Sequence, residues 1–434
     1  MGNAGGLRSD PLVHDWSSVG DGTTLATPEV LDETLRDGLQ SPAVTDPSAA
    51  DKVALLHAMA GLGIDGATVG FPAASTRAFE HAVRLATEVA TARLELDVVC
   101  AARTLEEDVA AALEVGQRSG LPVAVYAFVG VSPIRHRAEG WDLASVARRI
   151  ERAVALAVRA GHPVAFVAED ATRTPPETLR ILTQAALARG ASRVCVCDTV
   201  GHAAPEGVRR LLSYVRHVID AHGRDGVGID WHGHDDRGLA LANALVAVDH
   251  GADRVHATAL GMGERTGNTA MEQLLLNLAL EGRLGNRDLS TLADYAATAA
   301  RATEWSVPPH QPVVGRDAFR TASGVHAAAI LKARGHADRS LVERVYCGTA
   351  ASRVGCVQEV CISHNSGAAN VRHWLRDRGI KAPESLVRAI LRRAKGARRV
   401  LTDVEIYAVV DRPPRSASPL DDDASLAPAS RFAG

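Results

Sequence analysis

Short apolar segments and longer amphipathic segments alternate eight times between residues 30 and 281, which leaves few folds open to this chain. Apolar residues in the longer segments recur at helical spacing. The expected strands are 30–36, 66–71, 94–101, 123–129, 164–168, 193–197, 228–231 and 254–259. The expected helices are 46–61, 75–92, 105–118, 143–160, 175–188, 205–221, 239–249 and 270–281. Units of this size and order predict an α/β protein, a closed (β/α)8 TIM barrel.

An open, doubly wound parallel sheet is the alternative to the barrel. That fold commonly carries a G-x-G-x-x-G turn after its first strand, and the sequence has no such turn there. We therefore expect a barrel over residues 28–284, followed by a small, mostly helical C-terminal region.

The flanking segments differ from the barrel in composition. Residues 1–27, rich in Gly, Asp and Ser, and residues 411–434, with Pro, Ser and an acidic run, are expected to be flexible or disordered tails. Residues 285–320 are expected to be a linker because they contain the Pro-rich stretch 306–312. A helical subdomain is expected over 321–410, with helices at 323–333, 371–379 and 383–395.

Composition excludes several classes of protein. A net charge of −3 gives no basic field for nucleic acid, and no apolar run reaches the ~18 residues of a membrane span. The first residues lack the pattern of a secretory signal, so we expect a cytoplasmic protein that binds neither nucleic acid nor membranes. Its six cysteines do not suggest a disulfide framework in so long a chain. Cys195 and Cys197 share one face of a strand and are expected to be packing thiols rather than metal ligands.

Reactive residues follow the expected strands. Active groups of a barrel gather at the rim where its strands end. The segments that fit this rule are 36–37, 169–170, 198–199, 232–234 and 261–268. Because scattered surface residues would not all occur at strand exits, we expect one active site on this rim.

A divalent metal is the first function expected at this rim. His232 and His234 are two residues apart at a strand end, where both side chains point to one face. Asp37 would add a carboxylate, and Asn268 could add a carbonyl oxygen. This mixed set of nitrogen and oxygen ligands does not distinguish Mg, Mn, Zn and Co.

Two charged residues are candidates for catalysis. Arg36, beside the metal, would stabilise a developing oxyanion. Glu169 would act as a general acid or base, or would orient one. The structural alternative for Glu169 is that it caps a helix N-terminus.

Several ordered motifs give the chain a family resemblance from about residue 28 to 410. They are DETLRDGLQSP at 32–42, GFPAAS at 70–75, EDATR at 169–173, DTVG at 198–201, HGHDD at 232–236, GMGERTGN at 261–268 and SGVH at 323–326. The chain resembles the 2-isopropylmalate, homocitrate and citramalate synthases, which are the α-alkylmalate synthases. Hydroxymethylglutaryl-CoA lyase shares the RDGLQ wording, but GMGERTGN is similar to the synthases.

The resemblance implies a Claisen-type condensation of acetyl-CoA with a 2-oxo acid, in which the metal binds the oxo acid and acts as a Lewis acid. It places Asp37, His232, His234 and Asn268 at the metal. It also assigns Arg36 to the ketone oxygen, Glu169 and His326 to proton transfer, and Thr199 to the oxo-acid site. Gln40, in the first motif, is a further candidate for substrate binding.

The resemblance has two further implications. Gly263 and Gly267 would leave room for the CoA chain. His326, which lies beyond the expected linker, would act across the interface of a homodimer.

The sequence departs from the family around the oxo-acid pocket rather than around the metal. Thr68 stands where Glu is usual, and Thr321 where His is common. The other departures are Ala328 for a polar residue, Ala337, beside His336, for a Tyr, and His202 for a Tyr. These changes predict an altered oxo-acid specificity.

A basic cluster follows the expected fourth strand. In homocitrate synthases a nearby Arg receives the second carboxylate of 2-oxoglutarate, so Arg135 and His136 are candidates for substrate binding. The favoured oxo acid therefore carries a second anionic group, as in 2-oxoglutarate, oxaloacetate, phosphonopyruvate or phosphinopyruvate. The enzyme would then be similar to a 2-phosphonomethylmalate or 2-phosphinomethylmalate synthase.

Four alternatives remain open at this point. The basic cluster could be a solvated loop, and the enzyme a plain 2-isopropylmalate synthase acting on 2-oxoisovalerate. The chain could cleave a C–C bond as hydroxymethylglutaryl-CoA lyase does. It could also be an inactive barrel that serves as a binding protein.

Overall fold

The computed structural model describes residues 12–14, 26–338 and 340–411. They belong to two compact units, which divide between Gly315 and Arg316. The expected tails, 1–27 and 411–434, lie almost entirely outside the described residues.

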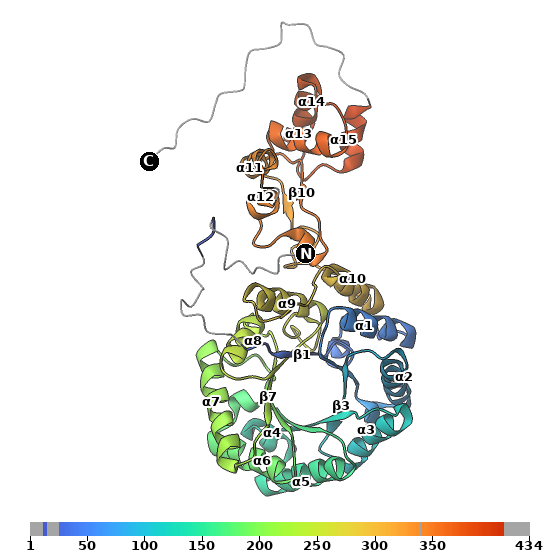
Figure 1. Ribbon diagram of the computed structural model, residues 1–434, viewed down its shortest axis with the longest axis vertical. Coiled ribbons are helices and arrows are strands. Elements are labelled where there is room, and N and C mark those ends of the chain that lie inside the picture. Colours follow the sequence, from blue (N-terminus) through green and yellow to red (C-terminus); the bar gives the residue numbers. More distant parts are fainter. Residues whose placement is uncertain (1–11, 15–25, 339, 412–434) are drawn as a thin grey trace. The chain divides into compact units, whose positions relative to one another are not determined.

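Eight parallel strands form a closed barrel in the first unit, which confirms the predicted TIM barrel (Figure 1). Each strand pairs with its neighbour in sequence, and the last strand returns to pair with the first. The strands are β1 (Glu29–Asp32), β2 (Gly66–Gly70), β3 (Asp97–Arg103), β4 (Ala124–Gly130), β5 (Val164–Glu169), β6 (Arg193–Asp198), β7 (Gly228–Gly233) and β8 (Arg254–Ala257).

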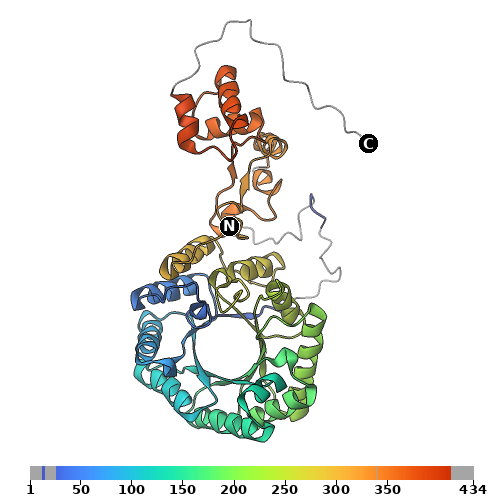
Figure 2. The ribbon, with the colours of Figure 1, turned by 180° about the vertical axis from the view of Figure 1, so that it is seen from behind.

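Helices surround the barrel and cover the outer face of its strands (Figures 1 and 2). They are α1 (Ala49–Gly61), α2 (Thr76–Ala92), α3 (Glu106–Ser119), α5 (Leu143–Arg159), α6 (Pro176–Ala188), α7 (Pro205–His222), α8 (Ala240–Asp249) and α9 (Met271–Leu280). A further short helix, α4 (Pro133–Glu139), follows β4 and has no buried residue. Side-chain caps start several of these helices, because a hydroxyl or carboxylate accepts from an unpaired N–H of the first turn. Ser48, Ser75 and Asp142 cap α1, α2 and α5 in this way. No helix in the described ranges has both the length and the apolar character that a membrane crossing requires.

Paired charges are buried where the strands begin. Asp230 accepts hydrogen bonds from the hydroxyl of Tyr126 and from Nε of Arg193, both at 2.6 Å. Arg254 donates to the Tyr126 hydroxyl at 3.0 Å and, from its other nitrogens, to carboxylates of Glu29 and Asp97 at 2.8 Å. A buried charge is costly unless it is paired in this way, so the network ties together the first residues of strands on several sides of the barrel.

A helix occurs where a linker was expected. Within residues 285–320, α10 (Leu292–Thr303) packs against α1. Its buried residues are Leu292, Tyr295, Ala296, Ala299 and Thr303, which follow helical spacing. Two of these five residues are alanine and one is threonine, so the apolar stripe is faint in the sequence. The helix brings the hydroxyl of Tyr295 to Oδ2 of Asp32 at the end of β1.

The second unit is small and mostly helical. It contains α11 (Gly324–Arg334), α12 (Leu341–Arg344), α13 (Ala368–Asp377), α14 (Glu384–Lys395) and α15 (Asp403–Val410), with a short parallel pair of β9 (Arg320–Thr321) and β10 (Glu359–Val360). One apolar cluster, which includes Trp374, Leu375, Val387 and Ile390, joins α13, α14 and α15.

Replacing Tyr295 by Phe should destabilise the barrel in a pH-dependent way. Burial raises the pKa of Asp32 from its ordinary value of 3.8 to about 6. The folded protein therefore loses stability as the pH rises between these two values and the buried carboxyl ionises. Above this range, the buried carboxylate depends on the Tyr295 hydroxyl. We expect Tyr295→Phe to lower the free energy of unfolding by about 1–3 kcal/mol at pH 8, and by less at pH 5, as measured by urea denaturation.

Tyr214→Phe is the matched control, because that hydroxyl donates to the carbonyl of Pro176 at the surface. An equal loss at both pH values in Tyr295→Phe would contradict the ionised role of Asp32.

Candidate active site

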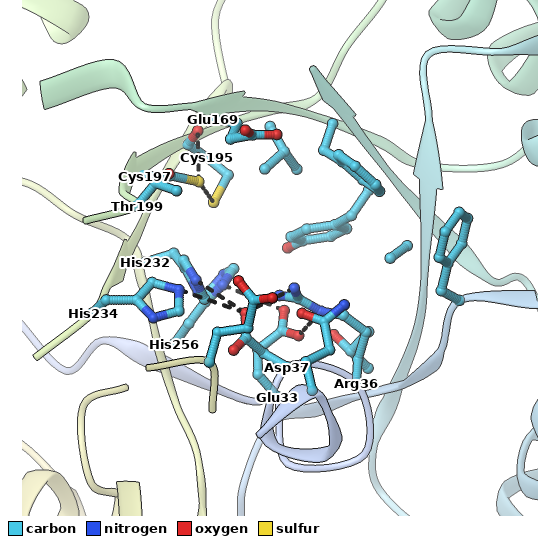
Figure 3. Close-up of a pocket in the computed structure, with 18 of the residues that line it drawn as sticks. Glu33, Arg36, Asp37, Glu169, Cys195, Cys197, Thr199, His232, His234 and His256 are labelled. Carbon is cyan, nitrogen blue, oxygen red and sulfur yellow. Dashed lines mark hydrogen bonds and ion pairs between the residues drawn. The ribbon is translucent and has the colours of Figure 1, made fainter. Parts of the chain in front are cut away.

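Three potential metal ligands meet at the rim where the barrel strands end. Oδ2 of Asp37 lies 3.7 Å from Nε2 of His232 and 3.7 Å from Nε2 of His234. All three residues are buried, and one ligand atom from each lies within 4.8 Å of the others. Figure 3 shows both imidazoles directed towards Asp37. Separations of this size suit atoms that share one ion at ~2.1 Å, so the residues predicted from the sequence fit a divalent metal.

The turn after β1 places Asp37 in this group. The amide of Thr34 donates to Oδ1 of Asp32 at 2.7 Å, and the amides of Arg36 and Gly38 both donate to the carbonyl of Glu33. These bonds reverse the chain directly after the strand. The carboxylate of Asp37 therefore lies beside the end of β7.

Burial and charge set the protonation of the three ligands. Burial lowers the pKa of His232 and of His234 below their ordinary value, although Asp37 opposes the shift. For Asp37, burial acts to raise the pKa, but Arg36 and the two histidines hold it below its usual range. Neutral imidazoles and an ionised carboxylate are the forms that bind metals.

Asn268 lies beside the same carboxylate. Its Nδ2 donates to Oδ1 of Asp37 at 2.8 Å and to the carbonyl of Met262 at 3.1 Å. Its Oδ1 is buried and has no hydrogen-bond partner among the described residues. A buried, unpaired carbonyl oxygen needs a partner, and a metal ion in this group would provide one.

The glycines of the loop after β8 stand where an added side chain would collide with neighbouring atoms. A Cβ on Gly263 would lie 2.2 Å from Nδ2 of Asn268 and 2.8 Å from Oδ1 of Asp37. A Cβ on Gly267 would lie 1.8 Å from the carbonyl oxygen of Gly261. Gly263 is therefore required by the packing of the loop against Asn268 and Asp37, and Gly267 by the packing of the loop on itself. Room for the CoA chain stays a prediction.

Arg36 is held between two carboxylates. Its Nε donates to Glu33 at 2.7 Å and its Nη1 to Oδ2 of Asp37 at 2.9 Å. The guanidinium lines the cavity, and its fixed orientation beside the metal ligands suits the stabilisation of an oxyanion.

Glu169 ends β5 and lies across the cavity from the metal ligands (Figure 3). Burial raises the pKa of its carboxyl above the ordinary value, and Arg135 opposes this rise. A carboxyl with a raised pKa suits general acid–base chemistry near neutral pH.

Arg135 and His136 lie on α4, which the sequence did not predict as a helix. Nη2 of Arg135 lies 3.2 Å from Glu139, and its Nε lies 4.0 Å from Oε1 of Glu169. Nε2 of His136 donates to the carbonyl of Gly130 at 3.1 Å, which ties α4 to the end of β4. Neither residue belongs to the cavity lining.

Thr199 and Gln40 both line the cavity, whereas His326 lies in the other unit. Oγ1 of Thr199 accepts from the amide of Asp170 at 2.8 Å, and Arg265 donates to the Thr199 carbonyl. His326 lies in the first turn of α11 with an exposed side chain.

A cavity of about 270 Å³ contains these groups and others that sequence reasoning missed. The missed lining residues include Glu33, Phe71, Ala101, Tyr126, Phe128, Val167 and His256. Glu264 and Arg265, which also line it, belong to the segment 261–268 that was expected at the rim. Tyr126 and Phe128 are two residues apart on β4, so they point to one face, but this spacing does not say which face lines the cavity. Cys195 and Cys197 also line the cavity; both are buried, with sulfurs 3.8 Å apart. Cys195 also lies close to Asp230 and His256, in a second group that could hold a metal.

Comparisons with known proteins agree with the motifs. The family model described as HMGL-like matches residues 27–298. Homocitrate synthase AksA of Methanopyrus kandleri is 34% identical over 402 residues, which cover 91% of this chain and 95% of that protein. The 2-isopropylmalate synthase of Pyrococcus abyssi is 31% identical over 389 residues, covering 88% of this chain and 77% of that protein.

Solved structures agree with the fold. The HMG-CoA lyase of Bacillus subtilis has a TM-score of 0.55 to this chain at 20% identity, and the match covers 66% of this chain and 97% of that one. At such low identity the likeness concerns the barrel alone.

Replacing His234 by Ala should remove metal binding without unfolding the barrel. Loss of a residue that only hydrogen-bonds to a metal ligand lowers metal affinity by ~10–100-fold. This variant loses one of the three ligands, so we expect a larger fall in metal affinity. Bound metal after reconstitution with Mg, Mn, Zn or Co would be measured by mass spectrometry, and folding by circular dichroism.

The control is His217→Ala, at an exposed position on α7. Full metal occupancy in His234→Ala would show that the ion binds elsewhere.

Proposed function

Because the chain belongs to the HMGL-like family, with homocitrate and 2-isopropylmalate synthases as relatives over most of its length, we propose that it is an acyltransferase that condenses acetyl-CoA with a 2-oxo acid. The products would be a 2-substituted malate and CoA. The observation that carries this proposal is the group of Asp37, His232 and His234 on one rim, with Arg36 bonded to the same carboxylate.

The metal would be held by Asp37, His232 and His234, with Oδ1 of Asn268 as a further donor. A bound divalent ion would supply Lewis-acid activation of the oxo acid. The mixed ligand set leaves Mg, Mn, Zn and Co open.

Side chains of the protein would stabilise the developing charge and transfer protons. The acetyl methyl would lose a proton to a base, its carbon would attack the ketone carbon of the oxo acid, and the ketone oxygen would take up a proton to become the hydroxyl of the product. Arg36 would stabilise the negative charge that forms on the ketone oxygen. Glu169, with its raised pKa, would take part in proton transfer or orient the group that does. Water then cleaves the thioester and releases CoA as a thiol.

Substrate contacts are proposed for residues of the cavity and its edge. Thr199 and Gln40 line the cavity and would contact the oxo acid. The distal part of the oxo acid would carry a second anionic group, which Arg135 and His136 would meet. Two observations support this: Thr68 in the cavity wall is neutral, and Arg135 comes within 4.0 Å of Glu169 at the cavity edge. A substrate anion would replace Glu139 as the partner of Arg135.

An apolar oxo acid is the second candidate, and the cavity wall favours it. Phe71 and Phe128 pack edge to face with ring centroids 5.8 Å apart, and Ala101 and Val167 lie in the same wall. Such a wall would suit the branched chain of 2-oxoisovalerate.

A panel of 2-oxo acids, assayed by thiol release from acetyl-CoA, tests both the reaction and the substrate. We expect 2-oxoglutarate, oxaloacetate or phosphonopyruvate to give a higher kcat/KM than 2-oxoisovalerate. Arg135→Ala should lower kcat/KM for anionic acids by about 10–100-fold, the effect of losing a charged hydrogen bond, and should change neutral acids little.

Arg137→Ala, on an exposed part of the same helix, controls for the general loss of positive charge. If 2-oxoisovalerate is the best substrate, or if Arg135→Ala affects both classes equally, the apolar candidate replaces the anionic one. An absence of thiol release with every acid and metal would favour C–C cleavage or a binding role instead.

We also propose a homodimer in which His326 serves the barrel of the partner subunit. Arg36→Ala and His326→Ala subunits should each be inactive alone. Mixing them should restore activity at about a quarter of the sites, because half of the statistical dimers hold one intact site. Absence of recovery, with subunit exchange shown by native mass spectrometry, would place both residues in one chain's site.

A further inference from the structure

The imidazole of His326 stacks on a tyrosine that comes from later in the chain. Its ring centroid lies 4.0 Å from that of Tyr346, with 27° between the ring planes. Both side chains are exposed. An exposed histidine has free rotation about its side-chain bonds unless a neighbour restricts it, so this contact decides how the ring is presented.

Apolar packing fixes the segment that carries Tyr346. Val342 and Val345, on α12 and just after it, pack against a small core made of Ala327 and Ile330 of α11 with Val360 of β10. Tyr346 follows directly after Val345. Ala327 and Ile330 belong to the same helix as His326. The core therefore fixes the backbone of His326 relative to that of Tyr346.

Polar contacts hold the same segment from its other side. The carboxylate of Glu343 accepts from the hydroxyl of Ser352 at 2.8 Å and from its amide at 3.4 Å. Nε2 of Gln358 donates to the sulfur of Cys347 at 3.3 Å. Both neighbours of Tyr346 in sequence are therefore held, by packing at Val345 and by a hydrogen bond at Cys347.

His336 is the other aromatic residue to consider, since it is nearer in sequence and lies beside Ala337. Nδ1 of His336 accepts from the amide of Asp338 at 3.3 Å, so the ring takes part in a local turn. Within the described part of the chain, the ring that contacts His326 is that of Tyr346.

We infer that Tyr346 is the positioning residue of His326, a role that rests on the proton-transfer function proposed for that histidine. The stacked face holds the plane of the imidazole and leaves its two nitrogens free at the ring edge. Aromatic pairs of this geometry favour the stacked orientation by about 2–10-fold over free rotation. Small misplacements of a catalytic group can cost up to ~10²-fold in rate, so loss of the stack should lower kcat.

Nuclear magnetic resonance tests the stack without any need for activity. In the full chain labelled with ¹³C-histidine, the His326 ring signal is identified by its disappearance in His326→Gln. We expect an upfield ring-current shift of this signal that is lost in Tyr346→Ala and kept in Tyr346→Phe. A His326 signal that does not move in Tyr346→Ala overturns the inference.

Kinetics test the consequence. Tyr346→Ala should lower kcat by about 2–10-fold, the preference that the stack supplies, with KM for both substrates changed little, and Tyr346→Phe should keep kcat near the wild-type value, since the stack needs only the ring. Tyr407→Ala is the matched control, because that partly exposed tyrosine of the same unit contacts Trp374 instead. His336→Ala should leave kcat unchanged.

The possible failures are distinguishable. If the wild type condenses no oxo acid, the proposed function fails, while the resonance experiment still decides whether Tyr346 orients the ring. An active wild type with an unchanged kcat in Tyr346→Ala overturns the positioning role. So does a Tyr346→Phe variant as slow as Tyr346→Ala, because the hydroxyl rather than the stack would then be responsible.

Discussion

Closure of the barrel between its first and last strands is the constraint on which the rest of the structure depends. β1 pairs with β8 in parallel over four residue pairs. This pairing brings the turn that carries Asp37 next to the loop that carries Asn268 and to the end of β7. None of these segments contains a site by itself. The buried group of one carboxylate, two imidazoles and one amide exists because the sheet has no edge.

The two ends of the barrel strands carry polar groups with different roles. At the start of the strands, Asp230 and Arg254 are paired with several partners, so their charges stabilise the closed form. At the other end, His232 and the Asn268 carbonyl retain capacity for a ligand. Asp230 and His232 are two residues apart on β7, so one strand serves both purposes. This division between a stabilising end and a reactive end is typical of such barrels.

Much of this arrangement could be predicted from the sequence, because strong local signals carried it. The eight strands occur within a few residues of their predicted bounds, and Asp37, His232 and His234 meet as strand-exit geometry predicted. The helix α10 was missed because its buried face carries two large apolar residues, Leu292 and Tyr295, and is otherwise small or polar. Phe128 and Tyr126 were missed because both faces of a barrel strand are buried, which hides the direction of each side chain. The contact of His326 with Tyr346 joins separate segments, and no local pattern reports it.

The hydrogen bond from Asn268 to Asp37 spans 231 residues of chain, and this span has a consequence for synthesis. Chains leave the ribosome from the N-terminus, so the turn with Asp37 emerges long before the loop that completes its surroundings. Until then the carboxylate and the histidines cannot be gathered, and contacts of such long range form late and slowly. A nascent chain is thus unable to capture an ion at this group before almost the whole barrel has been made, so ion capture can only follow folding and cannot guide its early steps.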